Sequence, residues 1–148
     1  MKKLLLIIGF CIIASGCATT RPTMSYVAPQ LTAADADVIS ADVVDYLARE
    51  LPPAKTVLTL DPPPQDMIGP ALIEQLPKKG FGMAFVDPND NATEHPERTL
   101  LRYVVVPFDS GFAVRLQYQG KEASRFYNRT TDGGLIAASR FTLREAVK

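Results

Sequence analysis

Apolar residues recur every three or four positions in two stretches of the chain, which is the spacing of an amphipathic helix. We predict a first helix from Thr32, which with Asp35 resembles a capping box, to the proline pair that begins at Pro52. A second is predicted at about 65–76, with Pro70 tolerated in the first turn, where amides have no helical partner. The apolar stripes of the two helices are Ile39, Val43, Tyr46, Leu47 and Leu51, and Met67, Ile68, Ala71, Leu72 and Leu76.

Five segments have the β-branched or alternating composition of strands. Two of them flank the second helix, at residues 55–60 and 81–86, and should run parallel through a right-handed crossover. The other three follow a polar loop and are expected to form a meander, at 99–108, 112–118 and 122–129. This order of elements predicts an α+β fold, in which two helices pack on one face of a mixed sheet of about five strands.

Alternation within the meander predicts which side chains face the core. In the middle strand these are Phe112, Val114, Leu116 and Tyr118. Gly111, at the end of the first turn, is expected to supply a positive φ. The final segment, 135–148, is compatible with either a short helix or a strand.

The start of the chain has the layout of a bacterial lipoprotein signal. Two lysines, an apolar run from Leu4 to Ala14 and two small residues precede Cys17. The apolar run is too short to span a bilayer, which takes about 20 residues. The small-small-Cys ending resembles the lipobox, in which the cysteine thiol receives a diacylglyceryl group and cleavage before it frees an amine for a further acyl chain. An uncleaved anchor, or an exported protein with an incidental cysteine, is the alternative.

This signal predicts three regions along the chain. Residues 1–16 are a signal peptide, 17–31 hold the lipidated cysteine and a flexible tether, and 32–148 form a single periplasmic domain. Acyl chains such as palmitate on Cys17 would hold the protein in the membrane, since each buried CH₂ adds roughly 0.8 kcal/mol. Ala18 after the cysteine, rather than an aspartate, favours the periplasmic face of the outer membrane.

The tether is expected to contribute nothing to the core. A chain that begins near Leu31 should then fold by itself. Met24, Tyr26 and Val27 argue against a purely passive spacer, because their side chains are more apolar than a linker requires.

The charge and the cysteine content of the chain limit which ligands and which disulfides we expect. The chain has 16 basic and 16 acidic side chains, and loss of Lys2 and Lys3 with the signal leaves 14 against 16. No basic stripe marks a nucleic-acid footprint, and no small-molecule substrate is expected. Cys11 leaves with the signal and Cys17 is used by the lipid, so no disulfide is expected.

No group of residues has the spacing of a catalytic or metal site. His95 is the one histidine, and it cannot form a zinc site of Cys and His ligands by itself. The acids around it lack the spacing of a calcium loop, and no nucleophile elbow or phosphate loop occurs. We therefore expect that the protein is not an enzyme and binds no cofactor or metal. The enzymatic alternative, a cell-wall hydrolase, would have no recognisable catalytic residue. The acids of this loop are Asp87, Asp90, Glu94 and Glu97.

Arginines and tyrosines gather in the predicted meander. Arg115, Arg125 and Tyr127 are predicted to project outward together from adjacent strands as a partner-binding face, because Arg and Tyr are enriched at interface hot spots. Tyr103 and Arg129 belong to the same group. An ordinary solvated sheet face is the alternative.

Several motifs together resemble the TrbH family of conjugal-transfer lipoproteins. They are the lipobox Cys17, the segment 41–56, the stretch 66–80 with the aromatic-rich strand after it, and the ending at 114–116 and 124–127. The resemblance implies a non-enzymatic component of a conjugative type IV secretion apparatus, which acts in mating-pair formation beside other envelope proteins. The family carries no known catalytic residues. A general outer-membrane lipoprotein, acting as a periplasmic protein-binding or assembly module, is the alternative.

We predict that Cys17→Ser accumulates as an unprocessed precursor, because serine lacks the thiol that accepts the lipid. Labelled palmitate and the electrophoretic mobility of the chain measure this directly. Cys11→Ser removes the other cysteine and should be lipidated normally. Fatty acid on the Cys17→Ser protein would contradict the assignment.

Overall fold

A computed structural model describes residues 25–60, 65–85 and 96–145. The helical elements are α1 (Ala33–Glu50), a 3₁₀ turn η1 (Pro53–Lys55) and α2 (Gly69–Lys78). The strands are β1 (Tyr26–Val27), β2 (Val57–Leu60), β3 (Gly82–Phe85), β4 (Arg98–Phe108), β5 (Gly111–Tyr118), β6 (Lys121–Arg129), β7 (Leu135–Ala137) and β8 (Thr142–Glu145).

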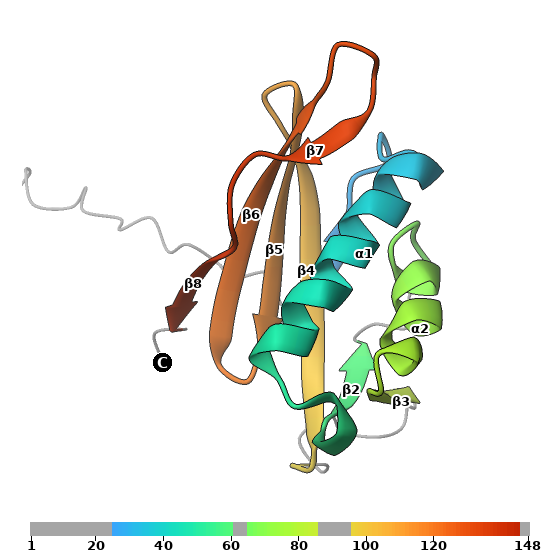
Figure 1. Ribbon diagram of the computed structural model, residues 1–148, viewed down its shortest axis with the longest axis vertical. Coiled ribbons are helices and arrows are strands. Elements are labelled where there is room, and N and C mark those ends of the chain that lie inside the picture. Colours follow the sequence, from blue (N-terminus) through green and yellow to red (C-terminus); the bar gives the residue numbers. More distant parts are fainter. Residues whose placement is uncertain (1–24, 61–64, 86–95, 146–148) are drawn as a thin grey trace, which may run out of the picture.

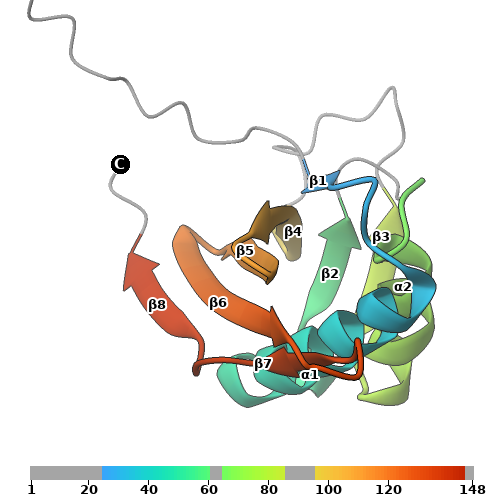
Figure 2. The ribbon, with the colours of Figure 1, turned by 90° about the horizontal axis from the view of Figure 1, so that it is seen from above.

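The strands form one mixed sheet, and both helices cover the same face of it (Figures 1 and 2). The order across the sheet is β3-β2-β4-β5-β6-β7, with β1 paired to β4 and β8 paired to β6. The predicted α+β class with two helices on one face of a mixed sheet is confirmed. The sheet has eight strands instead of about five, because three short strands lie in the segments predicted as tether and as tail.

β4 is the strand around which the sheet is built. Its first four residues pair in parallel with β2, and its last seven pair antiparallel with β5. β2 and β3 are parallel, with Val57 opposite Gly82, so the predicted crossover through α2 is confirmed. The meander of β4, β5 and β6 also follows the prediction closely.

The core lies between the helices and the inner face of the sheet. The inward side chains predicted for β5 are all at most 4% exposed, and they meet the apolar stripe of α1. The largest side chains with almost no exposure are Tyr103, Tyr118, Tyr127, Ile39, Leu47, Leu58, Leu60, Ile68, Leu72, Leu76, Leu101 and Leu116.

α2 starts and ends later than predicted. The carboxylate of Asp66 accepts hydrogen bonds from the amides of Ile68 and Gly69, both at 2.8 Å, and so caps the helix there. Pro77, one residue beyond the predicted end of the helix at 76, lies in its last turn. Proline is acceptable at that position because its φ is helical and only one backbone donor is lost.

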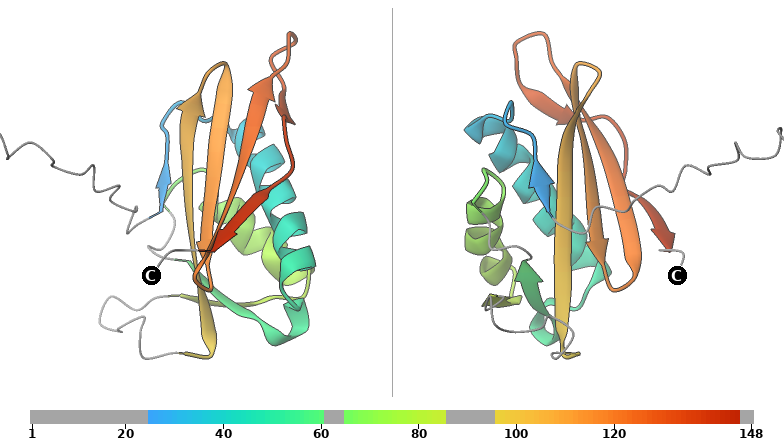
Figure 3. Two further views of the ribbon diagram at one scale, coloured as in Figure 1. Left: turned by 90° about the vertical axis from the view of Figure 1, so that its left-hand side faces the viewer. Right: turned by 180° about the vertical axis from the view of Figure 1, so that it is seen from behind.

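The segment predicted as a passive tether is partly folded. β1 lies parallel to β4 (Figure 3). The Ala28 amide, just after β1, donates to the Val105 carbonyl at 2.9 Å. Ala28 and Leu31 are buried in the core at 2% and 4% exposure. The predicted boundary at Thr32 is therefore wrong, because the described fold already includes residues 25–31. Met24 and Cys17 lie outside the described residues.

Gly111 is required for a reason other than the predicted one. Its φ is not positive; the first meander turn places the positive φ at Asp109 instead. A Cβ on Gly111 would lie 1.9 Å from the Tyr127 carbonyl oxygen, so only glycine lets β5 approach β6 this closely.

As far as Glu145, the last described residue, the tail is extended, not helical. β7 and β8 both pair with β6, at its end and at its beginning. Between them, the ring of Phe141 stacks on Tyr46 of α1 with centroids 4.1 Å apart. The tail therefore closes the open edge of the sheet against the helix.

We predict that a chain beginning at Thr32 is less stable than one beginning at Ser25. Loss of the Leu31 side chain from the core costs about 1.5–3 kcal/mol, and each lost β1 hydrogen bond about 1 kcal/mol. Urea unfolding of the two chains should differ by at least about 3 kcal/mol. Equal midpoints and slopes would show that residues 25–31 contribute nothing to the fold.

Candidate functional site

The structure divides the predicted partner residues between the two faces of the sheet. β5 pairs with β6 so that Val114 lies opposite Arg125 and Phe112 opposite Tyr127. Arg125 and Tyr127 therefore share the inner face, and Tyr127 is only 1% exposed. Arg115 is on the outer face, with its side chain 45% exposed. The prediction that these three residues project outward together is wrong.

Arg125 and Tyr127 both bind one carboxylate of α1. The Arg125 guanidinium donates to Asp42 Oδ1 at 2.6 Å, and the Tyr127 hydroxyl donates to Asp42 Oδ2. Burial, together with the hydrogen bond to Asp42, raises the pKa of Tyr127 well above its usual value. Tyr127 is therefore a permanent donor that holds the helix on the sheet.

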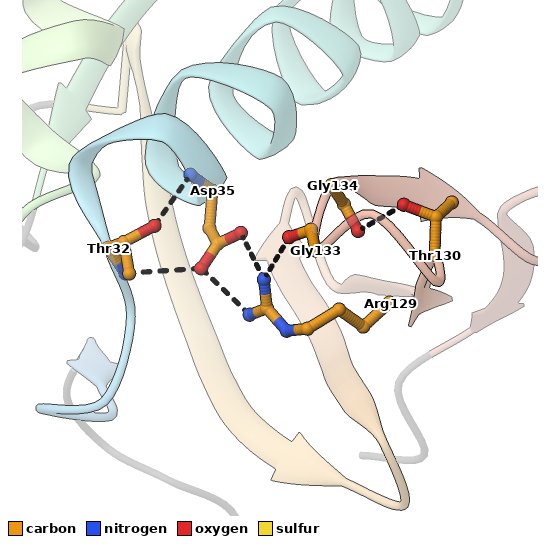
Figure 4. A network of polar contacts seen from close by, with 6 residues as sticks. All are labelled: Thr32, Asp35, Arg129, Thr130, Gly133 and Gly134. Carbon is orange, nitrogen blue, oxygen red and sulfur yellow. Dashed lines mark hydrogen bonds and ion pairs between the residues drawn. The ribbon is translucent and has the colours of Figure 1, made fainter.

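A second carboxylate on α1 binds Arg129 at the end of β6. The two terminal nitrogens of the Arg129 guanidinium donate to the Asp35 carboxylate at 3.1 and 2.9 Å, and one of them also donates to the Gly133 carbonyl at 2.8 Å. Figure 4 draws these contacts. The capping box predicted for Thr32 and Asp35 is present, with both reciprocal bonds at 3.2 Å. Burial would raise the pKa of Asp35, but the hydrogen bonds from Arg129 and Thr32 outweigh it and lower that pKa.

The remaining predicted residue, Tyr103, also points inward. Its hydroxyl donates to Asp66 Oδ2 at 2.8 Å, so the carboxylate that caps α2 is also bound to β4. Burial and this bond raise the pKa of Tyr103 strongly. Four of the five Arg and Tyr residues singled out in the sequence thus fasten helices to the sheet, and Arg115 alone of them lies on the outer face.

The outer face of the sheet carries an apolar surface that no described element covers. We call this the outer-face patch: Tyr26, Val104, Val106, Phe108, Phe126 and Ile136. Register places these side chains together, since Val106, Ala113 and Phe126 are cross-strand neighbours and Tyr26 pairs with Val104. The rings of Phe108 and Phe126 are in contact, with centroids 4.8 Å apart, and the two residues are 54% and 40% exposed. Contiguous exposed apolar side chains of this kind mark interaction surfaces.

The sequence contained a signal for this patch. The run Tyr103 to Val106 is apolar at every position, so both faces of β4 are apolar there. A strand that faces water on one side alternates instead. The outward prediction for Arg125 and Tyr127 implied that Phe126, which lies between them, faces the core, and the structure has both faces of β6 the other way round.

The described residues contain no group of three or more His, Cys, Asp or Glu that could hold a metal ion. They also contain no helix that is long and apolar enough to cross a membrane. His95 and most acids of its loop, together with Cys17, lie outside the described residues. Glu97 is described, and its carboxylate is 3.6 Å from the guanidinium of Arg98.

Comparison with known families decides what kind of protein this fold belongs to. The model of the family described as conjugal transfer protein TrbH matches residues 18–146. The chain belongs to the TrbH family. This match spans both helices and every described strand of the TrbH fold. A search of curated proteins and a search of solved structures each found no match.

We predict that Asp35→Asn lowers the free energy of unfolding at pH 7 by about 1.5–3 kcal/mol, the range for hydrogen bonds to charged groups. Because the pKa of Asp35 is lower in the folded chain than in the unfolded one, this contribution is present above about pH 4. It is lost as the pH falls through the folded-state pKa. Urea unfolding between about pH 7 and 3 should therefore show the two proteins converging in acid.

Glu74→Gln is the matched control for this measurement. Glu74 pairs with Lys78 at 2.6 Å, but both side chains are more than 65% exposed. Its replacement should change stability little at any pH. A constant difference between the wild type and Asp35→Asn across the whole pH range would contradict the role given to Asp35.

Proposed function

We propose that this protein is a lipid-anchored, non-enzymatic subunit of a conjugative type IV secretion apparatus, held at the periplasmic face of the outer membrane. Membership of the TrbH family makes it a conjugal transfer protein. The lipid anchor, the location at the outer membrane and the assembly role are the parts of the proposal that go beyond family membership. They are supported by the start of the sequence and by the outer-face patch.

The lipid anchor is supported by the order of charges, apolar run, small residues and Cys17. One acyl chain binds a bilayer marginally, whereas two or more hold it stably. Seven residues, 18–24, separate Cys17 from Ser25, where the described fold begins, so the chain makes eight Cα-to-Cα steps between them. At about 3.3–3.6 Å per residue, this leaves the domain within roughly 30 Å of the anchored cysteine.

An assembly role is supported by the contrast between polar side chains that are bonded within the fold and apolar side chains that are left exposed. Burial above all raises the pKa values of Tyr103 and Tyr127, so both hydroxyls stay protonated and donate within the fold, to Asp66 and Asp42. The outer-face patch is an exposed apolar surface that no described element covers, and the partner we propose for it is another protein of the transfer apparatus. Its exposed phenylalanines carry this part of the proposal.

We predict that Phe108→Ala combined with Phe126→Ala lowers the frequency of plasmid transfer. Loss of an interface anchor costs about 2 kcal/mol or more, which corresponds to roughly thirtyfold in affinity. Exposed substitutions change stability by only about 0.5 kcal/mol, so the melting temperature should barely move. Mating frequency, recovery of crosslinked apparatus proteins and thermal unfolding separate the two effects.

Phe85→Ala is the control. Phe85 is 54% exposed, as Phe108 is, but it lies on β3 at the far edge of the sheet. It should leave transfer unchanged. Normal transfer by the double variant, with normal recovery of crosslinked partners, would mean that the outer-face patch is not the assembly surface.

A further inference from the structure

A cleft of about 440 Å³ opens on the side of the molecule opposite to the outer-face patch. It lies between the C-terminal end of α1 and the segment that joins β7 to β8. Its size is within the range of sites that hold a small ligand or a few side chains. The residues that line it are Tyr46, Arg49, Glu50, Arg125, Arg140 and Phe141.

The cleft carries positive charge that no ion pair among the described residues neutralises. Three of its lining residues are arginines and one is a glutamate. In the described part of the chain, the side chains of Arg49, Arg140 and Glu50 take part in no hydrogen bond or ion pair. Two exposed guanidinium groups are therefore available at the rim, with ten N–H donors between them.

The third arginine is held in place and still has an unused donor. Arg125 is fixed by its 2.6 Å bond to Asp42, and its guanidinium lies 5.2 Å from the centroid of the Phe141 ring. Its Nε is buried and has no hydrogen-bond partner among the described residues. A buried donor without a partner is costly, and an oxygen that reached it would remove that cost.

The aromatic wall of the cleft is rigid. Tyr46 and Phe141 stack at 4.1 Å, and the Tyr46 hydroxyl shares a 2.8 Å hydrogen bond with that of Tyr118. Side chains held in this way lose little freedom when a ligand binds, which favours affinity. The cleft thus combines a fixed apolar wall with two unpaired cations at its rim.

We propose that this cleft binds an acidic peptide segment of another protein, with carboxylates of that segment paired to Arg49 and Arg140. Guanidinium groups bind carboxylates through two parallel hydrogen bonds, and such pairs are among the strong ones. A nucleic acid is the poorer fit, because the net formal charge of the chain is zero and Glu50 stands inside the cleft. The proposal needs neither the lipid anchor nor the outer-face patch, so it can fail or succeed independently of them.

Fluorescence anisotropy with the full chain in detergent tests this proposal. The probe is a short labelled peptide of glutamate and serine, compared with a glutamine-for-glutamate peptide of the same length. We expect the acidic peptide alone to bind, and its affinity to fall as NaCl rises from about 0.05 to 0.3 M. Arg49→Ala and Arg140→Ala should each weaken binding by about three- to tenfold.

Two further variants fix the location of the bound peptide. Glu50→Gln removes the one carboxylate in the cleft and should strengthen binding by about two- to threefold. Arg115→Ala removes the same charge as the two cleft variants but from the outer face, and it should leave binding unchanged. The side chains of Arg49 and Arg140 form no ion pair among the described residues, so thermal unfolding of these two variants should match that of the wild type. Arg115→Ala removes only a 3.6 Å ion pair of a half-exposed side chain, and its unfolding should change little.

The proposal is overturned if the acidic peptide fails to bind at concentrations up to about 1 mM. It is equally overturned if Arg115→Ala weakens binding as much as the cleft variants do, since the peptide would then follow the overall charge of the protein.

Discussion

The attachment of α1 to β6 through two carboxylates is the interaction on which the rest of this structure depends. Asp35 and Asp42 are seven residues apart, about 10 Å along the helix, and lie on the side that faces the sheet. Arg125, Tyr127 and Arg129 alternate inward over about 13 Å of β6. The two spacings match, so Asp42 binds Arg125 and Tyr127 while Asp35 binds Arg129. Because these bonds are directional, they fix the position and direction of α1 as apolar packing alone would not.

The two candidate binding surfaces follow from this attachment. Both helices are held on one face, so the opposite face of the sheet keeps its apolar side chains exposed as the outer-face patch. The same attachment places the C-terminal end of α1 beside the tail, where Arg49 and Arg140 flank the cleft. A TrbH-family protein built in this way has two separate surfaces of different chemistry, one apolar and one cationic. Under the two proposals made above, such a domain connects two other proteins of the transfer apparatus.

Elements with their own periodicity could be predicted from the sequence, whereas those defined by pairing could not. The capping box at Thr32, the crossover through α2 and the meander are local patterns, and the structure has all of them. β1 has two residues and β7 three, too few to show a period, and they are strands only because β4 and β6 offer them an edge. The faces of β6 were reversed because Arg125 and Tyr127 were predicted to point outward as interface residues. Two aspartates within the stripe of α1 were the overlooked signal, since a buried carboxylate requires a donor opposite to it.

A double-mutant cycle on Asp42 and Tyr127 tests the central claim most directly. Unfolding in urea would be measured for the wild type, Asp42→Asn, Tyr127→Phe and the double variant, with a parallel cycle on the exposed pair Asp45 and Lys79. We expect a coupling energy of about 1 kcal/mol or more between Asp42 and Tyr127, and a value within about 0.5 kcal/mol of zero for the exposed pair. Additive effects at Asp42 and Tyr127, with no coupling, would contradict the claim that this contact holds the helix on the sheet.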